Sequence, residues 1–471
     1  MSAALAFSSA AALAARIRSK ELSPVALLEA YLARIDRLDG TLHAYITVCR
    51  ESALAEARRA EQAVARGDRL GPLHGIPIAV KDQLDVAGTR TTAGSKLFAD
   101  RTALTDAPVI QRLRAAGAVI LGKLNLTEFA LGGTQQFPYG QPRNPWNPEY
   151  DPGGSSSGSG IAAAAALAAA TLGEDTGGSV RSPASNCGAV GHRPTWGLVP
   201  RTGCVPLCAS MDAIGPLTRT VEDAALLLAA IGGPDGTDLQ MRRRPPDDPM
   251  AQLRDGVRGL RIGLVRELTH GPDTAPEARD AVVSAAEVFR TLGARVDEVS
   301  LPLVPYAGAA FMALADSEGA GMHLQWLRER GAEYDAGTRR RLLAAALLPA
   351  GAYHQATRAR ALITRQVQAA MTHLDLLLTP TQPGPAPRIA TGQKAVSSKA
   401  DAGGRFFTRR SYTTPFNLAA MPAISLPCGF TESGLPLGLQ IAGRRYDDTT
   451  VLRAAWAYEQ ATPWHERRPP E

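Results

Sequence analysis

The chain has 471 residues, in which 51 Lys and Arg outnumber 45 Asp and Glu and leave a formal net charge of +6. A hydrophobic fraction of 45% excludes a disordered chain, and the 45 glycines follow no three-residue period, which excludes collagen. Five cysteines exclude a disulfide scaffold, and their odd number indicates reduced thiols in a cytoplasmic protein.

The positive charge is spread thinly along the chain. Its densest cluster, Arg242 to Arg244, is followed by two prolines and two aspartates, which favours a solvated loop over a track for phosphates. The longest apolar run, 161–172, is shorter than the roughly 20 residues that span a bilayer. We therefore expect neither a nucleic acid nor a membrane among the partners.

The first part of the chain has clear helix signals. Ser23 is a favourable N-cap, and Pro24 fits the first helical position, where its missing N–H costs nothing. The elements expected before residue 81 are a helix from Ser8 or Ser9 to about Ser19, a helix that begins at Pro24, a helix over 51–66 and a buried strand over 76–80.

Strands and helices alternate beyond residue 100. The expected helices are 107–116, 161–172, 220–231, 276–292 and several within 308–372, and the expected strands are 118–122, 260–265, 295–299, 374–378, 424–426 and 437–441. Loops are expected over 132–154 and 380–391, and the polar segment 236–255 is the best internal boundary. This alternation predicts an α/β protein with an internal sheet.

The first segment that suggests chemistry is Gly75–Asp82, with the sequence GIPIAVKD. Lys81 directly follows a buried strand, so its amine lies at a sheet end, where it can be partly desolvated. The alternative for this segment alone is a surface lysine whose side chain reaches into solvent.

The second segment is Gly153–Gly160, GGSSSGSG, which precedes an alanine-rich run. A phosphate-binding P-loop needs a lysine after its last glycine, and Ile161 stands there instead. A dinucleotide-binding turn needs a preceding strand, whereas the preceding segment is rich in Pro and Asn. A flexible linker is disfavoured because the alanine-rich run must pack closely.

The third segment is Gly173–Pro183, GEDTGGSVRSP. Two glycines before Ser179 allow a sharp turn that points backbone N–H groups inward. That geometry suits an oxyanion hole beside a hydroxyl nucleophile.

Together the three segments resemble the amidase signature family. Its members carry a lysine after a Gly-Ile-Pro-type strand, a Gly-Gly-Ser-Ser-Gly-Gly-Ser loop and a Gly-Thr-Asp-Thr-Gly-Gly-Ser-Ile-Arg segment. The order and spacing of Lys81, Ser155 and Ser179 also match. Further matches extend the likeness over nearly the whole chain, at Asn125–Phe129, Asn144–Trp146, Cys187–Gly188, Asp212–Pro216, Thr414–Asn417, Pro422–Ile424 and Gly438–Gln440.

The resemblance implies a Ser-cisSer-Lys triad. Ser179 would be the nucleophile, Ser155 would bridge it to Lys81, and Lys81 would be the final base. A lysine with its ordinary pKa near 10.4 is protonated at neutral pH, but burial lowers the pKa and would free the amine to accept a proton. The oxyanion would be held by the backbone N–H groups of Thr176, Gly177, Gly178 and Ser179.

The resemblance also implies supporting and substrate-binding residues. Gly154 would precede Ser155 in a cis peptide bond, and Asp175 and Arg181 would brace the loop as an ion pair, with ordinary solvated charges as the alternative. The acyl pocket would be lined by Thr127, Glu128, Phe129, Ala130, Leu131, Gly132 and Gly133. The chain departs from the common pattern at Ser157, Glu174, Asn186 and His192. At Ser157 a side chain is costly if φ is positive.

The implied fold is the amidase-signature α/β fold, in which a central, mixed, twisted β-sheet is covered on both faces by α-helices. We expect one domain over 1–471, with a helical part over 1–70, a catalytic core over 71–235, and a remainder over 236–471 that completes the sheet and the pocket. No metal or cofactor is expected, because the eight histidines lack metal-binding spacing and Cys204 and Cys208 lack a second cysteine pair.

The implied activity is hydrolysis of a carboxamide or arylamide C–N bond through an acyl-enzyme. Esters or carbamates are further possible substrates, and the expected form is a monomer or homodimer that acts on a small molecule. The alternative is the A subunit of a glutamine-dependent tRNA amidotransferase, which shares the triad but passes ammonia to a partner subunit. Glu174, Asn186 and Trp196 favour the stand-alone enzyme. A catalytically silent binding protein would have lost a triad residue, and none is lost.

Overall fold

The computed structural model describes residues 3–241, 247–390 and 407–470, so the Arg242–Arg244 cluster lies outside the described residues. Within them, 11 strands form one mixed sheet in the order β1-β3-β2-β4-β6-β5-β10-β11-β9-β7-β8. The strands are β1 (Tyr45–Val48), β2 (Pro77–Lys81), β3 (Val119–Leu124), β4 (Ala170–Glu174), β5 (Val190–Arg193), β6 (Ile214–Thr218), β7 (Arg261–Val265), β8 (Arg295–Val299), β9 (Leu376–Pro380), β10 (Ala423–Phe430) and β11 (Pro436–Gly443).

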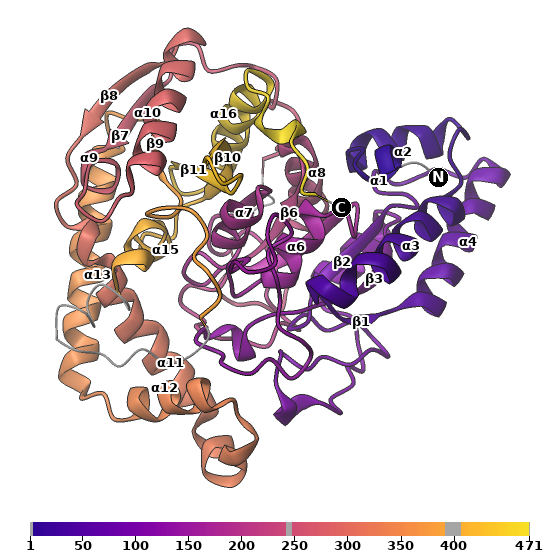
Figure 1. Ribbon diagram of the computed structural model, residues 1–471, viewed down its shortest axis with the longest axis horizontal. Helices are drawn as coiled ribbons and strands as arrows, with labels where there is room; N and C mark the ends of the chain where they lie inside the picture. The colour runs from indigo at the N-terminus through magenta and orange to yellow at the C-terminus, as the bar shows by residue number, and fades with distance from the viewer. Residues whose placement is uncertain (1–2, 242–246, 391–406, 471) are drawn as a thin grey trace.

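Helices flank this sheet (Figure 1), so the predicted α/β fold with a central mixed sheet is confirmed. They are α1 (Ala3–Ala6), α2 (Ala10–Arg18), α3 (Pro24–Leu42), α4 (Arg50–Arg66), α5 (Pro108–Ala115), α6 (Ser157–Ala164), α7 (Arg181–Cys187), α8 (Val221–Ile231), α9 (Arg266–Thr269), α10 (Pro276–Thr291), α11 (Ala307–Arg330), α12 (Ala336–Ala346), α13 (Ala350–Ala370), α15 (Thr414–Leu418) and α16 (Asp448–Gln460). In Figure 1, α1–α4 lie on one side of the molecule, α11–α13 lie on the opposite side, and α6 and α7 lie between them.

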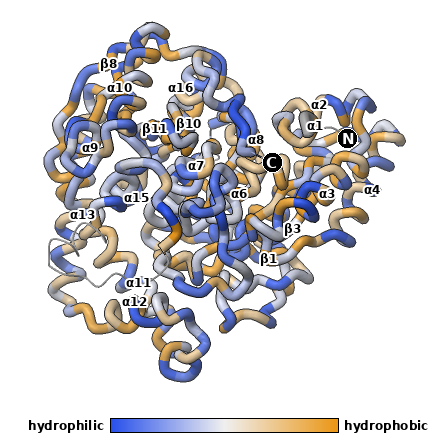
Figure 2. The backbone as a smooth tube through the Cα atoms, viewed as in Figure 1, coloured by the Kyte–Doolittle hydropathy of each residue, from blue (hydrophilic) through white to orange (hydrophobic). Residues whose placement is uncertain are grey.

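Several helices begin where the local signals predict. The Ser9 and Ser23 side chains each accept a hydrogen bond from a backbone N–H in the first turn, at 3.1 Å, and Pro24 opens α3. Hydrophobic and hydrophilic stretches alternate along outer helices such as α3 and α4 (Figure 2), as expected for helices with one buried face. No helix in the described ranges combines the length and apolar character needed to cross a bilayer.

The predicted helix over 161–172 is wrong. Helix α6 ends at Ala164, Ala166 has a left-handed φ of 51°, and residues from Ala170 form β4. Strand β4 pairs with β2 on one side and β6 on the other, so its backbone groups are satisfied by the sheet. Helix propensity is a weak preference, and pairing with two neighbours overrides it.

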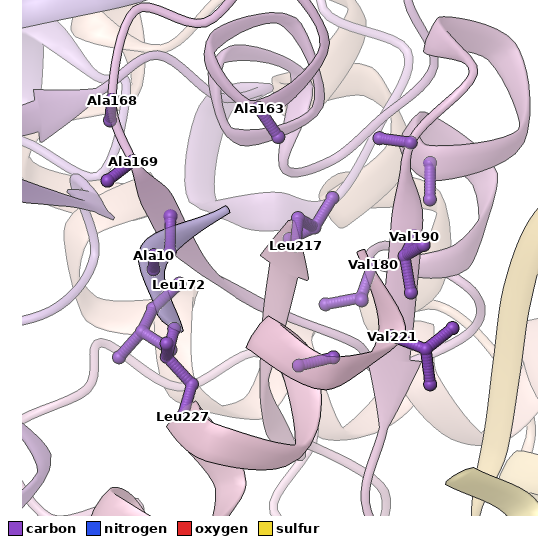
Figure 3. Packing of buried hydrophobic residues seen from close by; sticks show 14 of the residues in the cluster. Ala10, Ala163, Ala168, Ala169, Leu172, Val180, Val190, Leu217, Val221 and Leu227 are labelled. Carbon is purple, nitrogen blue, oxygen red and sulfur yellow. The ribbon is translucent and has the colours of Figure 1, made fainter. Parts of the chain in front are cut away.

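The alanine-rich segment lies in the larger of two hydrophobic clusters. Figure 3 shows Ala163, Ala168, Ala169, Leu172 and Leu217 within this cluster, and all of these side chains are buried. Short alanine side chains let the backbones approach closely, which gives the dense packing typical of protein cores.

Strands β1, β4, β5 and β6 are absent from the sequence-based prediction. Strands β6 and β5 matter most, because they join the strands of the first half of the chain to β10 and β11. The sheet thereby brings the C-terminal segments beside the loops that follow β2 and β4.

Candidate active site

Lys81 is the last residue of β2, and its side chain is fully buried. Its Nζ donates to Ser155 Oγ at 2.8 Å and lies 3.3 Å from Glu174 Oε2. Burial lowers the pKa of Lys81, while the Glu174 carboxylate raises it in part. The alternative of a solvent-exposed lysine is therefore wrong.

Ser155 precedes α6 and follows a cis Gly154–Ser155 peptide bond. Ser155 and Ser179 both line a cavity of about 560 Å³. Ser155 is only 3% exposed, whereas Ser179 is partly accessible. Among the described residues the hydrogen bonds lead from Lys81 to Ser155 but not on to Ser179, and such catalytic bonds are often loose before substrate binds.

The segment between β4 and α7 makes the turn that presents Ser179. Gly178 has a φ of +116°, and a Cβ there would collide with the Thr413 side chain, so the turn needs glycine. The Gly178 N–H donates to Asp175 Oδ1 at 2.8 Å. The expectation that this N–H faces an oxyanion is therefore wrong, because a buried carboxylate already takes it.

The other three amides of this turn differ from that of Gly178. The N–H groups of Thr176, Gly177 and Ser179 have no hydrogen-bond partner among the described residues. Three N–H groups thus remain available for a developing negative charge beside Ser179.

The Asp175 side chain holds the turn between β4 and α7 in place. Its carboxylate is fully buried and accepts bonds from Arg181 Nε and Nη2, both at 3.0 Å, so Asp175 and Arg181 form an ion pair rather than two solvated charges. Burial raises the pKa of Asp175, but the Arg181 and Arg193 guanidinium groups hold it well below its usual range. The carboxylate therefore stays charged and keeps its hold on the Gly178 N–H.

Two C-terminal side chains hold the carbonyl groups of the same turn. Asn417 Nδ2 donates to Thr176 O at 2.7 Å, and Thr413 Oγ1 donates to Gly177 O at 2.7 Å. With these carbonyls fixed, the neighbouring N–H groups have a defined direction. Sequence reasoning assigned these residues no function, and the only signal was the weak match around Thr414–Asn417.

Glu174 connects Lys81 to a second buried carboxyl. Thr176 Oγ1 lies 2.7 Å from Glu174 Oε1 and 2.7 Å from Asp212 Oδ1. Burial and the nearby Glu174 carboxylate raise the pKa of Asp212 to about 7, and hydrogen bonds from the Thr176 hydroxyl and the Cys208 N–H lower it in part. The Thr176 hydroxyl thus links Asp212 to the carboxyl that contacts Lys81.

The cavity contains most of the predicted substrate-binding segment. Its lining includes Thr127, Ala130, Leu131, Gly132 and Gly133, but not Glu128 or Phe129. Their expected place in the pocket is therefore wrong. The Glu128 carboxylate accepts bonds from Ser95 Oγ and Asp335 N, and the Phe129 ring packs edge-on against Phe98 and His323.

Sequence reasoning also missed several cavity residues, because no local pattern marks them. These are Gln141, Asp151, Ile389, Ala390 and Arg410, among others. Ser157 lines the cavity too, and it begins α6 without a positive φ, so the anticipated backbone cost does not arise. His192 lies in β5, where its Nε2 is 3.2 Å from Asp448 Oδ1.

The comparison with known proteins decides the family. The profile of the family described as Amidase matches residues 26–452. The chain belongs to the amidase signature family. As a member, it is an enzyme that acts on carbon–nitrogen bonds.

Three relatives show how far the likeness extends. The A subunit of the glutamyl-tRNA(Gln) amidotransferase of Thermosynechococcus vestitus is 40% identical over 96% of this chain and 97% of its own. A chain from a vestigial protein complex, described as revealing the evolutionary origins of an s-triazine catabolic enzyme, is 35% identical, covers 96% of this chain and 98% of its own, and has a TM-score of 0.89. The peptide amidase of Stenotrophomonas maltophilia is 33% identical over 98% of both chains, with a TM-score of 0.85.

These relatives correct the expected partners. The amidotransferase relative is by name one subunit of an enzyme that acts on glutamyl-tRNA(Gln), and the second relative comes from a protein complex. The expectation of a monomer or homodimer with no link to nucleic acid is therefore wrong. The thinly spread positive charge was a poor guide, because the charge density of one chain does not reveal whether that chain works within an assembly that acts on tRNA.

Proposed function

We propose that the chain hydrolyses a carboxamide by acyl transfer to Ser179, as the A subunit of a glutamine-dependent tRNA amidotransferase. The buried hydrogen bond from Lys81 to Ser155, at the cavity that also holds Ser179, supports the chemistry. The 40% identity to the A subunit of a known amidotransferase, over 96% of the chain, supports the biological role.

In the proposed first half-reaction, neutral Lys81 accepts the Ser155 proton while Ser155 takes the proton of Ser179. Ser179 Oγ attacks the amide carbon, and the oxyanion is held by the free N–H groups of the turn, each typically worth about 3 kcal/mol in the barrier. The C–N bond then breaks as the proton returns through Ser155 to the leaving nitrogen, so a primary amide releases ammonia.

In the second half-reaction, water attacks the acyl-Ser179 ester. Lys81 and Ser155 accept the proton of this water and return it to Ser179 Oγ as the ester breaks. The products are a carboxylic acid and the regenerated serine. In the amidotransferase the ammonia passes to a partner subunit for transfer to the tRNA-bound acyl group.

A stand-alone amidase is the second candidate. The TM-score of 0.85 to a peptide amidase, over 98% of both chains, favours it. The same triad serves both functions, so the two candidates differ in the substrate and in the need for partners.

Ammonia release from the purified chain, alone and with the remaining subunits of the amidotransferase, tests the proposal. We expect glutamine hydrolysis to be slow for the chain alone and to rise when the other subunits and glutamyl-tRNA(Gln) are added, with formation of glutaminyl-tRNA. Full activity on small amides without partners, together with inertness toward glutamine in the reconstituted mixture, would establish the second candidate.

Glu174→Gln is expected to move the acidic limb of the kcat/KM profile to lower pH. The catalytic form contains neutral Lys81, and the Glu174 carboxylate raises the pKa of that lysine. Removal of the charge therefore frees the base at a lower pH. The pH dependence of kcat/KM measures the shift. Glu459→Gln, which changes another buried carboxyl on α16, should leave the limb in place.

Asn417→Ala is expected to lower kcat by about 10-fold to 100-fold with little change in KM. The loss removes the bond from Asn417 Nδ2 to Thr176 O, and the adjacent N–H groups lose their fixed direction toward the oxyanion. Separate kcat and KM values on a simple amide, with a thermal melt to confirm folding, check the prediction. An unchanged kcat in a folded variant would remove Asn417 from this positioning role.

A further inference from the structure

Two charged side chains line the catalytic cavity within the described residues, Asp151 and Arg410. Asp151 Oδ1 accepts a bond from Gly153 N at 2.7 Å, and its charge raises the pKa of Arg409 against the lowering effect of burial. The cavity therefore contains one carboxylate engaged with its own loop and one guanidinium.

No described acidic side chain lies within ion-pair distance of Arg410, and no described group accepts a hydrogen bond from its guanidinium. The two neighbouring arginines, in contrast, have partners. Arg341 pairs with Asp316 at 2.5 Å, and Arg409 Nε donates to Gln382 Oε1 at 2.6 Å. Among these three arginines, Arg410 alone lines the cavity, and burial lowers its pKa only to about 10, so it remains charged at neutral pH.

The position of Arg410 is well defined. Its carbonyl accepts bonds from Thr413 N at 3.2 Å and Thr414 Oγ1 at 2.8 Å, so its backbone is fixed beside the residue that holds Gly177 O. Its Nη2 lies 3.6 Å from where a Cβ on Gly132 would stand, which places the guanidinium against the 127–133 wall of the cavity. The cation thus faces the same space as Ser155 and Ser179.

We propose that Arg410 binds a carboxylate of the substrate, so that the cavity selects amides whose acyl part ends in an anionic group. The carboxylate that acts on Arg410, Asp316, is already paired with Arg341. A guanidinium without an ion-pair partner of its own in a partly enclosed cavity is compensated best by a carboxylate, which accepts two parallel N–H bonds. The inference rests on the proposed function in that Ser179 attacks the amide of the same molecule. Glutamine has such a carboxylate, but so do other ω-amides of dicarboxylic acids.

Two substrates separate the parts of this proposal. Glutaramate is glutamine without its α-amino group, and pentanamide has the same carbon chain with a methyl group in place of the carboxylate. We expect the native enzyme to prefer glutaramate over pentanamide. Arg410→Met should lower kcat/KM for glutaramate by about 10-fold to 100-fold, mainly through KM, and change pentanamide by less than about twofold. Arg410→Lys should recover only part of the loss, because it keeps the charge but not the forked geometry.

Arg409→Met is the matched control, since Arg409 is the adjacent arginine and does not line the cavity. It should leave the ratio of glutaramate to pentanamide rates unchanged. An Arg410→Met protein that keeps the native ratio, or a native enzyme that shows no preference for glutaramate, would overturn the proposal.

Binding provides a readout that does not depend on turnover. In a Ser179→Ala background, calorimetry should show glutaramate binding that weakens about 10-fold or more when Arg410→Met is added. If glutamine is not hydrolysed in the presence of the complete set of subunits, the proposed function is refuted, but the binding of glutaramate through Arg410 is not. Equal binding of glutaramate with and without Arg410→Met would refute the carboxylate site and leave the proposed function standing.

Discussion

Ser179→Ala is expected to reduce kcat by about 10⁴-fold or more on any amide that the native enzyme hydrolyses. The hydroxyl is the only side-chain group of this residue that the proposed mechanism uses, and the backbone N–H that faces the oxyanion is kept in the variant. The side chain opens into the cavity rather than the core. Folding should therefore be unaffected. Ammonia release under saturating substrate measures the loss, and a thermal melt confirms the native fold.

Ser182→Ala is the matched control for this variant. Ser182 lies three residues further on, at the start of α7, and its side chain bonds Gln382 instead of lining the cavity. It should retain activity within a fewfold of the native enzyme. After rapid acid quenching, the acyl group should be found on the Ser179 peptide in the native and Ser182→Ala proteins. Normal turnover by the Ser179→Ala protein would show that another residue is the nucleophile.

Lys81→Met is expected to lower kcat/KM by about 10³-fold or more, because Ser155 then has no base to which it can pass a proton. The same change also removes the amine that lies 3.3 Å from the buried Glu174 Oε2. Leaving a buried polar group without its partner typically costs about 1–3 kcal/mol of stability. We therefore expect a lower unfolding midpoint in urea as well as lost activity.

A double variant separates these two effects. Lys81→Met combined with Glu174→Gln removes the amine together with the carboxylate that faces it, so it should recover most of the stability but none of the activity. Urea unfolding and kcat/KM, measured on the same preparations, decide the matter. Recovered activity in the double variant would mean that Lys81 acts only through folding and is not the base.

Local sequence was sufficient for the elements whose signals lie within a few residues. Ser23 and Pro24 mark the start of α3 because capping and a fixed φ act on the first helical turn alone. The apolar run before Lys81 predicted a strand that ends there, but it left both a partly desolvated and a solvent-exposed amine open, and the structure shows that the side chain is buried. The run at 161–172 failed because its second half is paired on both sides within the sheet, which alanine content does not reveal.

The sequence by itself determined the family and the order of Lys81, Ser155 and Ser179, since these depend on residue types at fixed separations. Only the tertiary structure decided what surrounds them. Asn417 and Arg410 reach the site from a segment more than 200 positions beyond Ser179, brought there by the sheet. Contacts over such separations are made by packing and charge pairing across the fold, and neighbouring residues in the chain do not encode them.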